Sequence, residues 1–551
     1  MRNLGTNEYS PSLTDLQYLE RKTSLLPITM ADRLFLAVAI MLFVTAVLLR
    51  LASVLTTQVL ITDERTSLLV ATGHAEEFIY QNGEKSFPVA QWVPAQEWQR
   101  YLEVEPGSDI RTVFTDLWRT DIHPPVYFLL LRIWTQLFGN AYITSKILSF
   151  LLDLVAVALL TITARTLLPR RDSGWSAALI WIISPIAILG GATIRQYSLL
   201  TIWIIIFTLL LGNYLLNNPQ PEEKRRLVLG LLVTAIVGLL THLVFSLVLC
   251  AAFVTIILND RESKRRFILL PLLVIMTGVL LVAFFIPESL LLHAYLAPKI
   301  QTIGFQDELM VRYLRRSFML LSPLLIPLGV FLVTYVSMRV RNKPVSFSTA
   351  PDLRATLGFL LTMLILTYGL HSVMYLTGVF YPYTISDHHL LYITPLVALV
   401  ATGLLQLIPR TNIGSLATIG LMVGLFLITA LRVGSNMGDA RGTIDLHQLS
   451  NYDLIVVDLI NRPELFPYMN PDSQVYANYQ PDLISRQEDW LPRLISEGGI
   501  YVSLLETGNY AIGDAEGREQ ILRMIEEKGS VKLIGSTTDQ GATVSVYEVD
   551  N

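Results

Sequence analysis

The sequence contains little charge and almost no cysteine. Only 16% of its 551 residues are charged, whereas 52% are hydrophobic, and the mean hydropathy is +0.50. This balance excludes an ordinary soluble protein and indicates a polytopic membrane protein. The single cysteine, Cys250, lies in an apolar run and cannot form an intramolecular disulfide, so we expect it to pack in the core.

Signals for several other classes of protein are missing as well. The formal net charge is −4, so no strongly basic surface indicates a nucleic-acid partner. The sequence shows no internal repeat with interrupted helices, which is the pattern typical of secondary transporters. The first 30 residues are polar and mixed in charge, unlike a signal peptide, so we expect the first apolar run to remain as a membrane helix.

Apolar runs of membrane-spanning length recur over most of the chain. They predict a polytopic α-helical membrane domain over residues 33–432, with about 11 to 13 transmembrane helices. The run at 227–258 is too long for one helix, and the polar pair Thr241-His242 at its middle predicts a hairpin of two helices. The other runs lie at about 34–60, 123–139, 143–168, 175–192, 198–217, 267–287, 318–337, 357–378, 389–407 and 413–432.

Basic clusters orient this domain, because loops rich in lysine and arginine stay in the cytoplasm. They place segment 1–32 inside, and Arg195, Thr241-His242, loop 61–120 and everything after about 433 outside the plasma membrane. Three runs separate the loop from Arg195, and three crossings would leave Arg195 inside. One of these runs is therefore expected to be re-entrant or partly inserted, unless a crossing is missing. The clusters are Arg170-Arg171, Lys224 to Arg226, Lys264 to Arg266, Arg339 to Lys343, and Arg410.

The polar loop at 61–120 carries large aromatic side chains among its charges. Trp92, Trp98, Tyr101 and Trp118 are typical of short amphipathic helices that lie in the membrane interface, with their rings at headgroup level. We expect these helices to pack over the membrane helices.

The composition changes completely from about residue 444. Short β-type runs separated by Pro, Asn, Asp and Gly predict a small α/β domain over 444–551, with one helix at 515–528. This domain contains neither a Gly-rich phosphate loop nor a Cys/His cluster with metal-ligand spacing, so we expect it to be dispensable for bond chemistry and to lie outside the membrane. The β-type runs are DLIVVDLI, SQVYA, GGIYVSLLE, VKLIGST and ATVSVYEV.

Pro124 and Pro125 predict the start of a helix that follows the polar loop. Proline lacks an N–H, so a proline pair is tolerated best in the first helical turn, where the donors have no partner in any case. Asp121 and His123 then lie just before the helix, beside N–H groups that favour an anion such as a phosphate. The alternative is that Asp121 only caps the helix and His123 is an ordinary interfacial histidine.

Two adjacent carboxylates, Asp63 and Glu64, directly follow the first apolar run. Neighbouring side chains diverge on a helix or strand, so one acts and the other supports it, or neither acts. The acting carboxylate would be a general base or would hold a divalent cation, and the alternative is a solvated helix end.

Arg195 lies between two apolar runs, and its guanidinium suits bidentate phosphate binding. Arg132 is expected to snorkel or to pair with a carboxylate. Further charges in or beside apolar runs are Arg50, Lys146 and Asp153.

These motifs occur together in an order that carries a resemblance. Asp63-Glu64 is followed by a loop of about 60 residues, then by D-x-H-P-P-x-Y with L-L-x-x-W-x-x-L-F-G, by R-x-Y-S-L and by T-H. Over about residues 30–430 the chain resembles bacterial membrane glycosyltransferases related to protein O-mannosyltransferases and to the aminoarabinose transferases of lipid A. These enzymes belong to the GT-C superfamily.

The resemblance implies transfer of a sugar, a hexose or a pentose, from a polyprenyl-phosphate donor with inversion at the anomeric carbon. It places the active site on the outer face of the membrane and leaves open whether the acceptor is a lipid, a glycan or a protein. It implies that Asp63 is catalytic, with Glu64 supporting, and that any divalent cation is held by Asp63. The substrate-binding residues that it implies are Asp121, His123, Arg195, Tyr197 and His242.

The chain departs from the pattern of these relatives in two places. Lys146 stands where they commonly have arginine, and Asp387-His388-His389 stands where they often have Arg-Tyr before a proline.

Two other functional classes also fit a chain with many apolar runs. A lipid or sugar transporter or flippase would share the intramembrane charges, and a polysaccharide polymerase would share the substrates but would not need D-x-H-P-P.

Overall fold

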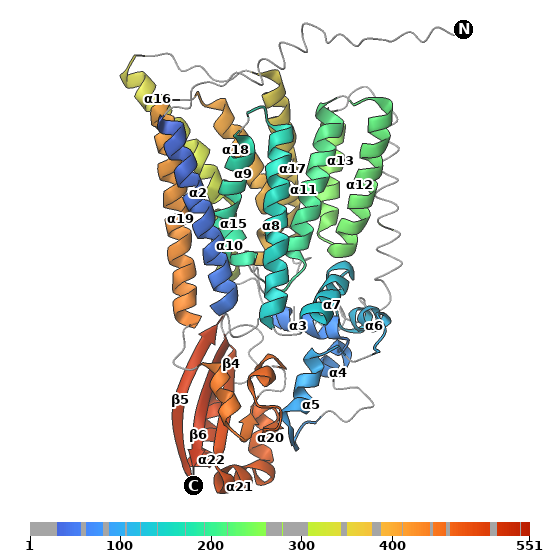
Figure 1. Ribbon diagram of the computed structural model, residues 1–551, viewed down its shortest axis with the longest axis vertical. Coiled ribbons are helices and arrows are strands. Elements are labelled where there is room, and N and C mark those ends of the chain that lie inside the picture. Colours follow the sequence, from blue (N-terminus) through green and yellow to red (C-terminus); the bar gives the residue numbers. More distant parts are fainter. Residues whose placement is uncertain are drawn as a thin grey trace, which may run out of the picture.

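A bundle of long helices stands on a smaller α/β part in the computed structural model of the chain (Figure 1). The loop after the first helix lies between the two (Figure 1). The structure describes residues 30–56, 62–80, 88–104, 107–121, 123–139, 142–170, 172–191, 193–217, 219–259, 278, 307–342, 350–376, 387–409, 411–440, 445–458, 463–506, 515–539 and 542–550.

The bundle confirms the predicted polytopic helical class. Within the described residues, seven helical segments are long and apolar enough to cross a membrane. The segment His388–Leu407 is central, since 83% of its most apolar window is buried, against 22% in the peripheral segments Leu36–Leu55 and Asn412–Gly434. The helices of the bundle are α2 (Met30–Thr56), α8 (Tyr142–Leu167), α9 (Ser173–Ile182), α10 (Pro185–Gly190), α11 (Tyr197–Leu216), α12 (Pro221–Thr241), α13 (Phe245–Asn259), α15 (Asp307–Leu321), η2 (Ser322–Leu324), α16 (Leu325–Val340), α17 (Pro351–Leu376), η3 (Asp387–Ile393), α18 (Thr394–Leu407) and α19 (Asn412–Ala440).

Two helix breaks in the bundle follow from the sequence. The predicted hairpin at 227–258 is confirmed, because α12 ends at Thr241 and α13 begins at Phe245. The run at 175–192 is divided by Pro185 at the first turn of α10, where the hydroxyl of Ser184 accepts a hydrogen bond from the backbone N–H of Ala187. The predicted run 267–287, apart from Gly278, and the basic residues 264–266, Lys343 and Arg410 lie outside the described residues.

Helix α7 (Val126–Phe138) belongs to one of the three runs that the sequence places between the loop and Arg195. With 13 residues it is about 20 Å long, which is short of a hydrocarbon core of about 30 Å. It lies beside α3 and α6 at the end of the bundle (Figure 1). Arg132 in α7 donates hydrogen bonds to the backbone oxygen of Ala71 and to Ser108, so it anchors the loop and does not snorkel. The run at 175–192 is also interrupted, because α9 has 10 residues and α10 has 6, so both runs contain helices shorter than a membrane span.

The tail forms the α/β domain that the sequence predicts. Its five strands and the helix α22 (Ala515–Glu526) fall on the predicted segments. Strand β2 pairs in parallel with β3 and β4, whereas the other pairs are antiparallel. The sheet order is β1-β3-β2-β4-β6-β5, with β1 (Trp92–Pro94), β2 (Leu454–Val457), β3 (Gln474–Ala477), β4 (Gly499–Glu506), β5 (Ser530–Asp539) and β6 (Ala542–Asp550); the other helical elements are η4 (Leu446–Asn451), η5 (Pro463–Tyr468), α20 (Gln480–Ser485) and α21 (Gln487–Glu497).

The loop after α2 forms short helices, as predicted, and also supplies a strand that the sequence did not reveal. Strand β1 joins the edge of the tail sheet, where Val93 pairs with Val475. The ring of Trp98 stacks on Phe466 with centroids 4.8 Å apart, and Gln99 donates to the backbone oxygen of Phe466. Loop and tail therefore form one packed unit. The loop contains α3 (Thr62–Thr72), α4 (Ala75–Tyr80), α5 (Ala95–Gln99), η1 (Arg100–Leu102) and α6 (Arg111–Thr120).

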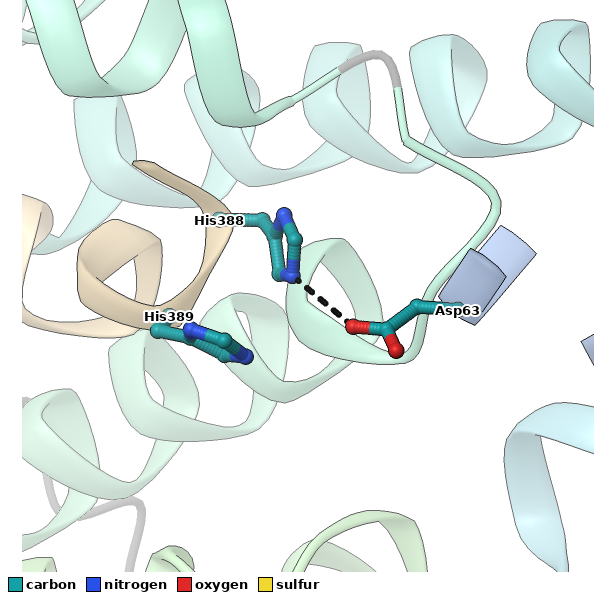
Figure 2. A group of neighbouring side chains, drawn as sticks. All are labelled: Asp63, His388 and His389. Atoms are coloured by element: carbon teal, nitrogen blue, oxygen red, sulfur yellow. Dashed lines mark ion pairs between the residues drawn. The ribbon is translucent and has the colours of Figure 1, made fainter. Parts of the chain in front are cut away.

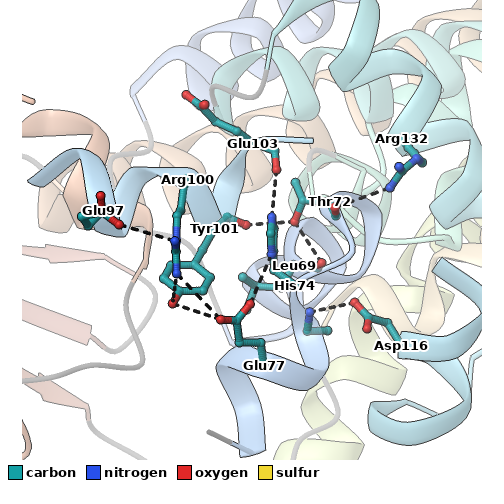
Figure 3. A network of polar contacts seen from close by, with 11 residues as sticks. Leu69, Thr72, His74, Glu77, Glu97, Arg100, Tyr101, Glu103, Asp116 and Arg132 are labelled. Carbon is teal, nitrogen blue, oxygen red and sulfur yellow. Dashed lines mark hydrogen bonds and ion pairs between the residues drawn. The ribbon is translucent and has the colours of Figure 1, made fainter. Parts of the chain in front are cut away.

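Buried polar contacts fix the helices of the loop against one another (Figure 3). One ring nitrogen of His74 lies 3.1 Å from the backbone oxygen of Glu103, and the other lies 3.7 Å from Glu77. Asp116 accepts a hydrogen bond from the N–H of Ala75 and so caps α4 from a distant part of the loop. Burial raises the pKa of Asp116 to about 6, against the effect of this hydrogen bond.

An ion pair ties α2 to the rest of the bundle. Nη1 of Arg50 lies 3.0 Å from Oδ2 of Asp153 in α8, and both side chains are almost fully buried. The guanidinium also lies over the ring of Trp181. Gly191 packs so closely on Asp153 that an added Cβ would lie 1.8 Å from Oδ2. The ion pair thus holds α2, which precedes Asp63, close to the segment around Gly191, which precedes Arg195.

We expect Trp98→Ala to destabilise the protein by about 3–5 kcal/mol, because it empties a fully buried indole site between loop and tail. Thermal unfolding in detergent measures the loss, with Trp118→Ala, which removes a partly exposed ring from the same loop, as the control. If the two variants were equally stable, the prediction that loop and tail pack into one unit through Trp98 would be wrong. The same contacts lead us to expect that removal of the tail disturbs the packing of the loop.

For the ion pair we expect Arg50→Met to cost about 3–5 kcal/mol, because it leaves the buried carboxylate of Asp153 without its partner. Arg50→Met combined with Asp153→Asn should recover most of this loss, since no buried charge then remains. Chemical or thermal unfolding of Arg50→Met, Asp153→Asn and the double variant in one detergent provides the measurement. If the double variant lost as much free energy of unfolding as the two single variants together, Arg50 and Asp153 would not stabilise each other.

Candidate active site

The site residues predicted from the sequence gather at one end of the bundle, beside α3 (Figure 1). They come from segments that are far apart in the chain and meet through contacts at hydrogen-bond and ring distances. Asp63 and Glu64 lie in the first turn of α3, and Asp121 and His123 precede α7. Arg195 lies between α10 and α11, Tyr197 is the first residue of α11, and His242 lies between α12 and α13.

The two adjacent carboxylates point to different surroundings, as the sequence predicts. Oε1 of Glu64 accepts a hydrogen bond from the backbone N–H of Ile194 at 3.0 Å and lies 3.3 Å from Nζ of Lys146, with no exposed surface. The side chain of Asp63 remains 41% exposed and lies 3.5 Å from Nε2 of His388. Glu64 is therefore a buried structural partner, and Asp63 is the carboxylate that a substrate can reach.

Arg195 connects Asp63 to the segment before α7. Its Nη1 donates to the backbone oxygen of Asp63 at 3.2 Å and to the hydroxyl of Ser67 at 3.1 Å. Its Nη2 lies 3.5 Å from Nε2 of His123. Arg195 therefore contacts both the backbone of Asp63 and the ring of His123. Nε of Arg195 has no hydrogen-bond partner among the described residues, although the side chain is buried.

Polar contacts orient two histidines of the site. Nδ1 of His123 lies 2.5 Å from Oδ1 of Asp121, so this carboxylate orients the ring. Nδ1 of His242 accepts a hydrogen bond from the N–H of Val244, which leaves the proton of the neutral ring on Nε2. Burial lowers the pKa of His242, and nearby positive groups, His123 among them, add to this effect. His242 Nε2 is an N–H donor with no hydrogen-bond partner within the described part of the chain.

His388 and His389 complete the cluster, although the sequence indicated them only as a departure from the pattern of relatives. Both rings lie on Tyr197, with centroids 5.2 and 5.4 Å from the tyrosine ring, and the two histidine rings are 4.3 Å apart. The available signal was a histidine pair at the edge of an apolar run, where polar rings need a partner. The 3₁₀ helix η3 turns both rings toward α3.

Charges around Asp63 keep it ionised. Burial alone would raise the pKa of its carboxyl group, but the positive charge of Arg195 and the contact with His388 outweigh burial and hold this pKa well below its usual range. The site thus presents an accessible carboxylate beside a buried guanidinium and several imidazoles. Such a set can take up a proton at the carboxylate and bind an anion at the guanidinium.

The ion pair of Lys146 with Glu64 generates a prediction for the site. Lys146→Met should destabilise the fold by about 3–5 kcal/mol, because the fully buried carboxylate of Glu64 then loses the positive charge that compensates it. Lys146→Arg should remain folded, because the positive charge stays. Size-exclusion chromatography and thermal unfolding after detergent extraction compare both with Arg111→Met, a change of a highly exposed cation. A Lys146→Met protein as stable as Arg111→Met would contradict the structural role.

Part of the sequence matches the model of a known protein family. Residues 122–290 match the family model described as dolichyl-phosphate-mannose-protein mannosyltransferase. That stretch includes four of the predicted site residues, His123, Arg195, Tyr197 and His242, but neither Asp63 nor the histidine pair of η3. No protein with a curated description matches the sequence.

Solved structures of similar proteins come from two bacteria. ArnT from Cupriavidus metallidurans, in a crystal structure bound to undecaprenyl phosphate, has a TM-score of 0.48 and 12% identity, over 92% of this chain and 97% of that chain. Its apo structure has the same TM-score at 11% identity. Arabinosyltransferase EmbB from Mycobacterium smegmatis has a TM-score of 0.35 and 12% identity, over 85% of this chain and 44% of that chain.

The family match and the architecture lead to one conclusion. The matched stretch runs from the residue before His123 through the α12–α13 hairpin that carries His242, and the chain has the multi-pass helical form that the sequence predicted. Over residues 122–290 the chain is therefore similar to this family of membrane glycosyltransferases, which supports the GT-C resemblance that the sequence carries.

Proposed function

We propose that the protein transfers a sugar from a polyprenyl-phosphate donor to an acceptor at the outer face of the membrane, with inversion at the anomeric carbon. The observation that carries this proposal is the accessible carboxylate of Asp63 beside the buried guanidinium of Arg195. The donor class follows from the matching family, whose description names a dolichyl-phosphate sugar. The acceptor is a lipid, a glycan or a protein.

Asp63 is the general base of the proposed reaction. Its carboxylate accepts the proton of the acceptor's hydroxyl or amine as the acceptor oxygen or nitrogen attacks the anomeric carbon. The bond from this carbon to the phosphate oxygen breaks with its electron pair remaining on the phosphate. Attack occurs on the face opposite the leaving phosphate, so the configuration inverts. Because the leaving group is already an anion of low basicity, no general acid is required.

Cationic and N–H donor groups stabilise the leaving phosphate. The unpaired Nε of Arg195 supplies a charged donor, and Nε2 of His242 supplies a neutral one. Asp121 holds His123 in the orientation that faces Arg195, which keeps the guanidinium in place. Preorganised donors of this kind are each worth about 10²-fold or more in rate.

The orientation in the membrane follows from the positive charges. The site and the tail lie at one end of the bundle, and the basic residues at the start of α12 and the end of α16 lie at the other (Figure 1). Loops rich in lysine and arginine stay in the cytoplasm. The proposed site and the C-terminal domain therefore face the outside. The basic residues are Lys224, Arg225, Arg226, Arg339 and Arg341.

Substitution of Asp63 tests the proposal. Asp63→Asn keeps the size of the side chain, so the protein level should remain normal while turnover falls by about 10²-fold or more. Asp63→Glu should be partly active, because one methylene moves the carboxylate. The measurement is transfer of radiolabelled sugar in membranes supplied with defined polyprenyl-phosphate sugars.

Glu97→Gln is the matched control, since it changes a half-exposed carboxylate in the same loop. It should leave turnover unchanged. Near-normal turnover of Asp63→Asn at equal protein level would remove Asp63 from the mechanism.

A further inference from the structure

Three potential metal ligands converge at the site (Figure 2). Asp63 reaches in from α3, and His388 and His389 reach in from η3, more than 300 residues later in the chain. One donor atom of each side chain lies within 4.8 Å of the other two. Figure 2 shows the carboxylate facing the two imidazoles.

The position of His388 is unusual for an ordinary buried histidine. Its side chain is only 2% exposed, and its Nε2 makes no hydrogen bond within the described part of the chain. A buried ring nitrogen without a partner costs free energy, so native structures rarely retain one without a reason. The nearest charged group is Oδ2 of Asp63, and this nitrogen points to it across 3.5 Å.

That separation fits two ligands of one ion better than a hydrogen bond. Hydrogen bonds between nitrogen and oxygen measure about 2.7–3.2 Å. Two ligands at about 2.1 Å from a tetrahedral zinc ion lie about 3.4 Å apart. The observed 3.5 Å between Nε2 of His388 and Oδ2 of Asp63 is close to this value. The donor atom of His389 lies within 4.8 Å of the other two, so all three side chains are within reach of one ion after a small adjustment of the rings.

We infer that Asp63, His388 and His389 form a binding site for a divalent transition-metal ion, with zinc as the best match. Two imidazole nitrogens and one carboxylate are a donor set that zinc accepts, whereas magnesium and calcium prefer oxygen ligands alone. Three protein ligands leave the fourth position of the ion open.

The role of the ion rests on the proposed function. With Oδ2 of Asp63 on the ion, Oδ1 remains available to accept the proton of the acceptor. A phosphate oxygen of the donor would occupy the open position of the ion, with Arg195 as a second cationic group of the same site. The negative phosphate then compensates the charges of the ion and the guanidinium. The binding site itself does not depend on the identity of the reaction.

The test measures metal binding by the purified full-length protein. Protein treated with a chelator is titrated with Zn²⁺ against a competing fluorescent indicator, and bound zinc is counted by elemental analysis. We expect one zinc per chain in the cluster, and about 100-fold or more weaker binding in His388→Gln, since loss of a direct ligand costs at least as much as loss of a group behind it. Co²⁺ in the same site should give visible absorption bands that His388→Gln abolishes.

His447→Gln is the control, since it removes an exposed histidine of the tail and should leave zinc binding unchanged. Size-exclusion chromatography verifies the fold of each variant, and His389→Gln replaces His388→Gln if the latter does not fold. Absence of bound zinc, or zinc bound equally by the ligand variants, would overturn the site. Zinc binding without sugar transfer would refute the proposed function alone, and full transfer in a protein shown to bind no zinc would refute the metal site alone.

Discussion

The charge of Arg195 has to be satisfied at the edge of a hydrocarbon layer, and the arrangement of the site depends on this constraint. Its guanidinium binds the backbone of Asp63, the hydroxyl of Ser67 and the ring of His123. The start of α3, the approach to α7 and the approach to α11 therefore meet at one point. Glu64 connects the same two segments a second time, because its carboxylate accepts a hydrogen bond from the backbone N–H of Ile194, the residue before Arg195.

The two neighbouring carboxylates divide structural support and chemistry between them. Glu64 is fully buried and neutralised by Lys146, so its removal acts on the fold. Asp63 is accessible and surrounded by positive or polar groups, so it is the one suited to proton transfer. This division follows from helix geometry, since adjacent side chains point about 100° apart.

The loop between the first helix and α7 links the membrane bundle to the tail. It supplies Asp63 and Glu64 on α3, the strand β1 to the tail sheet, and Trp98 to the contact with Phe466. The tail begins after residue 444 in the chain, but its sheet contains a strand from the loop. Because this loop also positions the candidate base, the stability of the tail and the geometry of the site are physically connected.

Hydropathy, proline positions and turn residues are local properties, so the sequence by itself determined the elements that depend on them. The membrane helices, the hairpin at Thr241-His242, the helix start after Pro125 and the strands of the tail all follow from such patterns. Through the resemblance that it carries, the order of motifs also predicted that Asp63, His123 and Arg195 belong to one site.

Contacts between distant segments depend on packing, and only the tertiary structure decided these. Hydropathy does not show that α7 is too short to cross while its arginine anchors the loop, because length and hydrogen-bond partners are settled by neighbouring segments. The same holds for strand β1, whose three residues become a strand only beside β3. It holds above all for His388 and His389, which acquire chemical meaning only where η3 brings them to Asp63, since no sequence spacing relates ligands more than 300 residues apart.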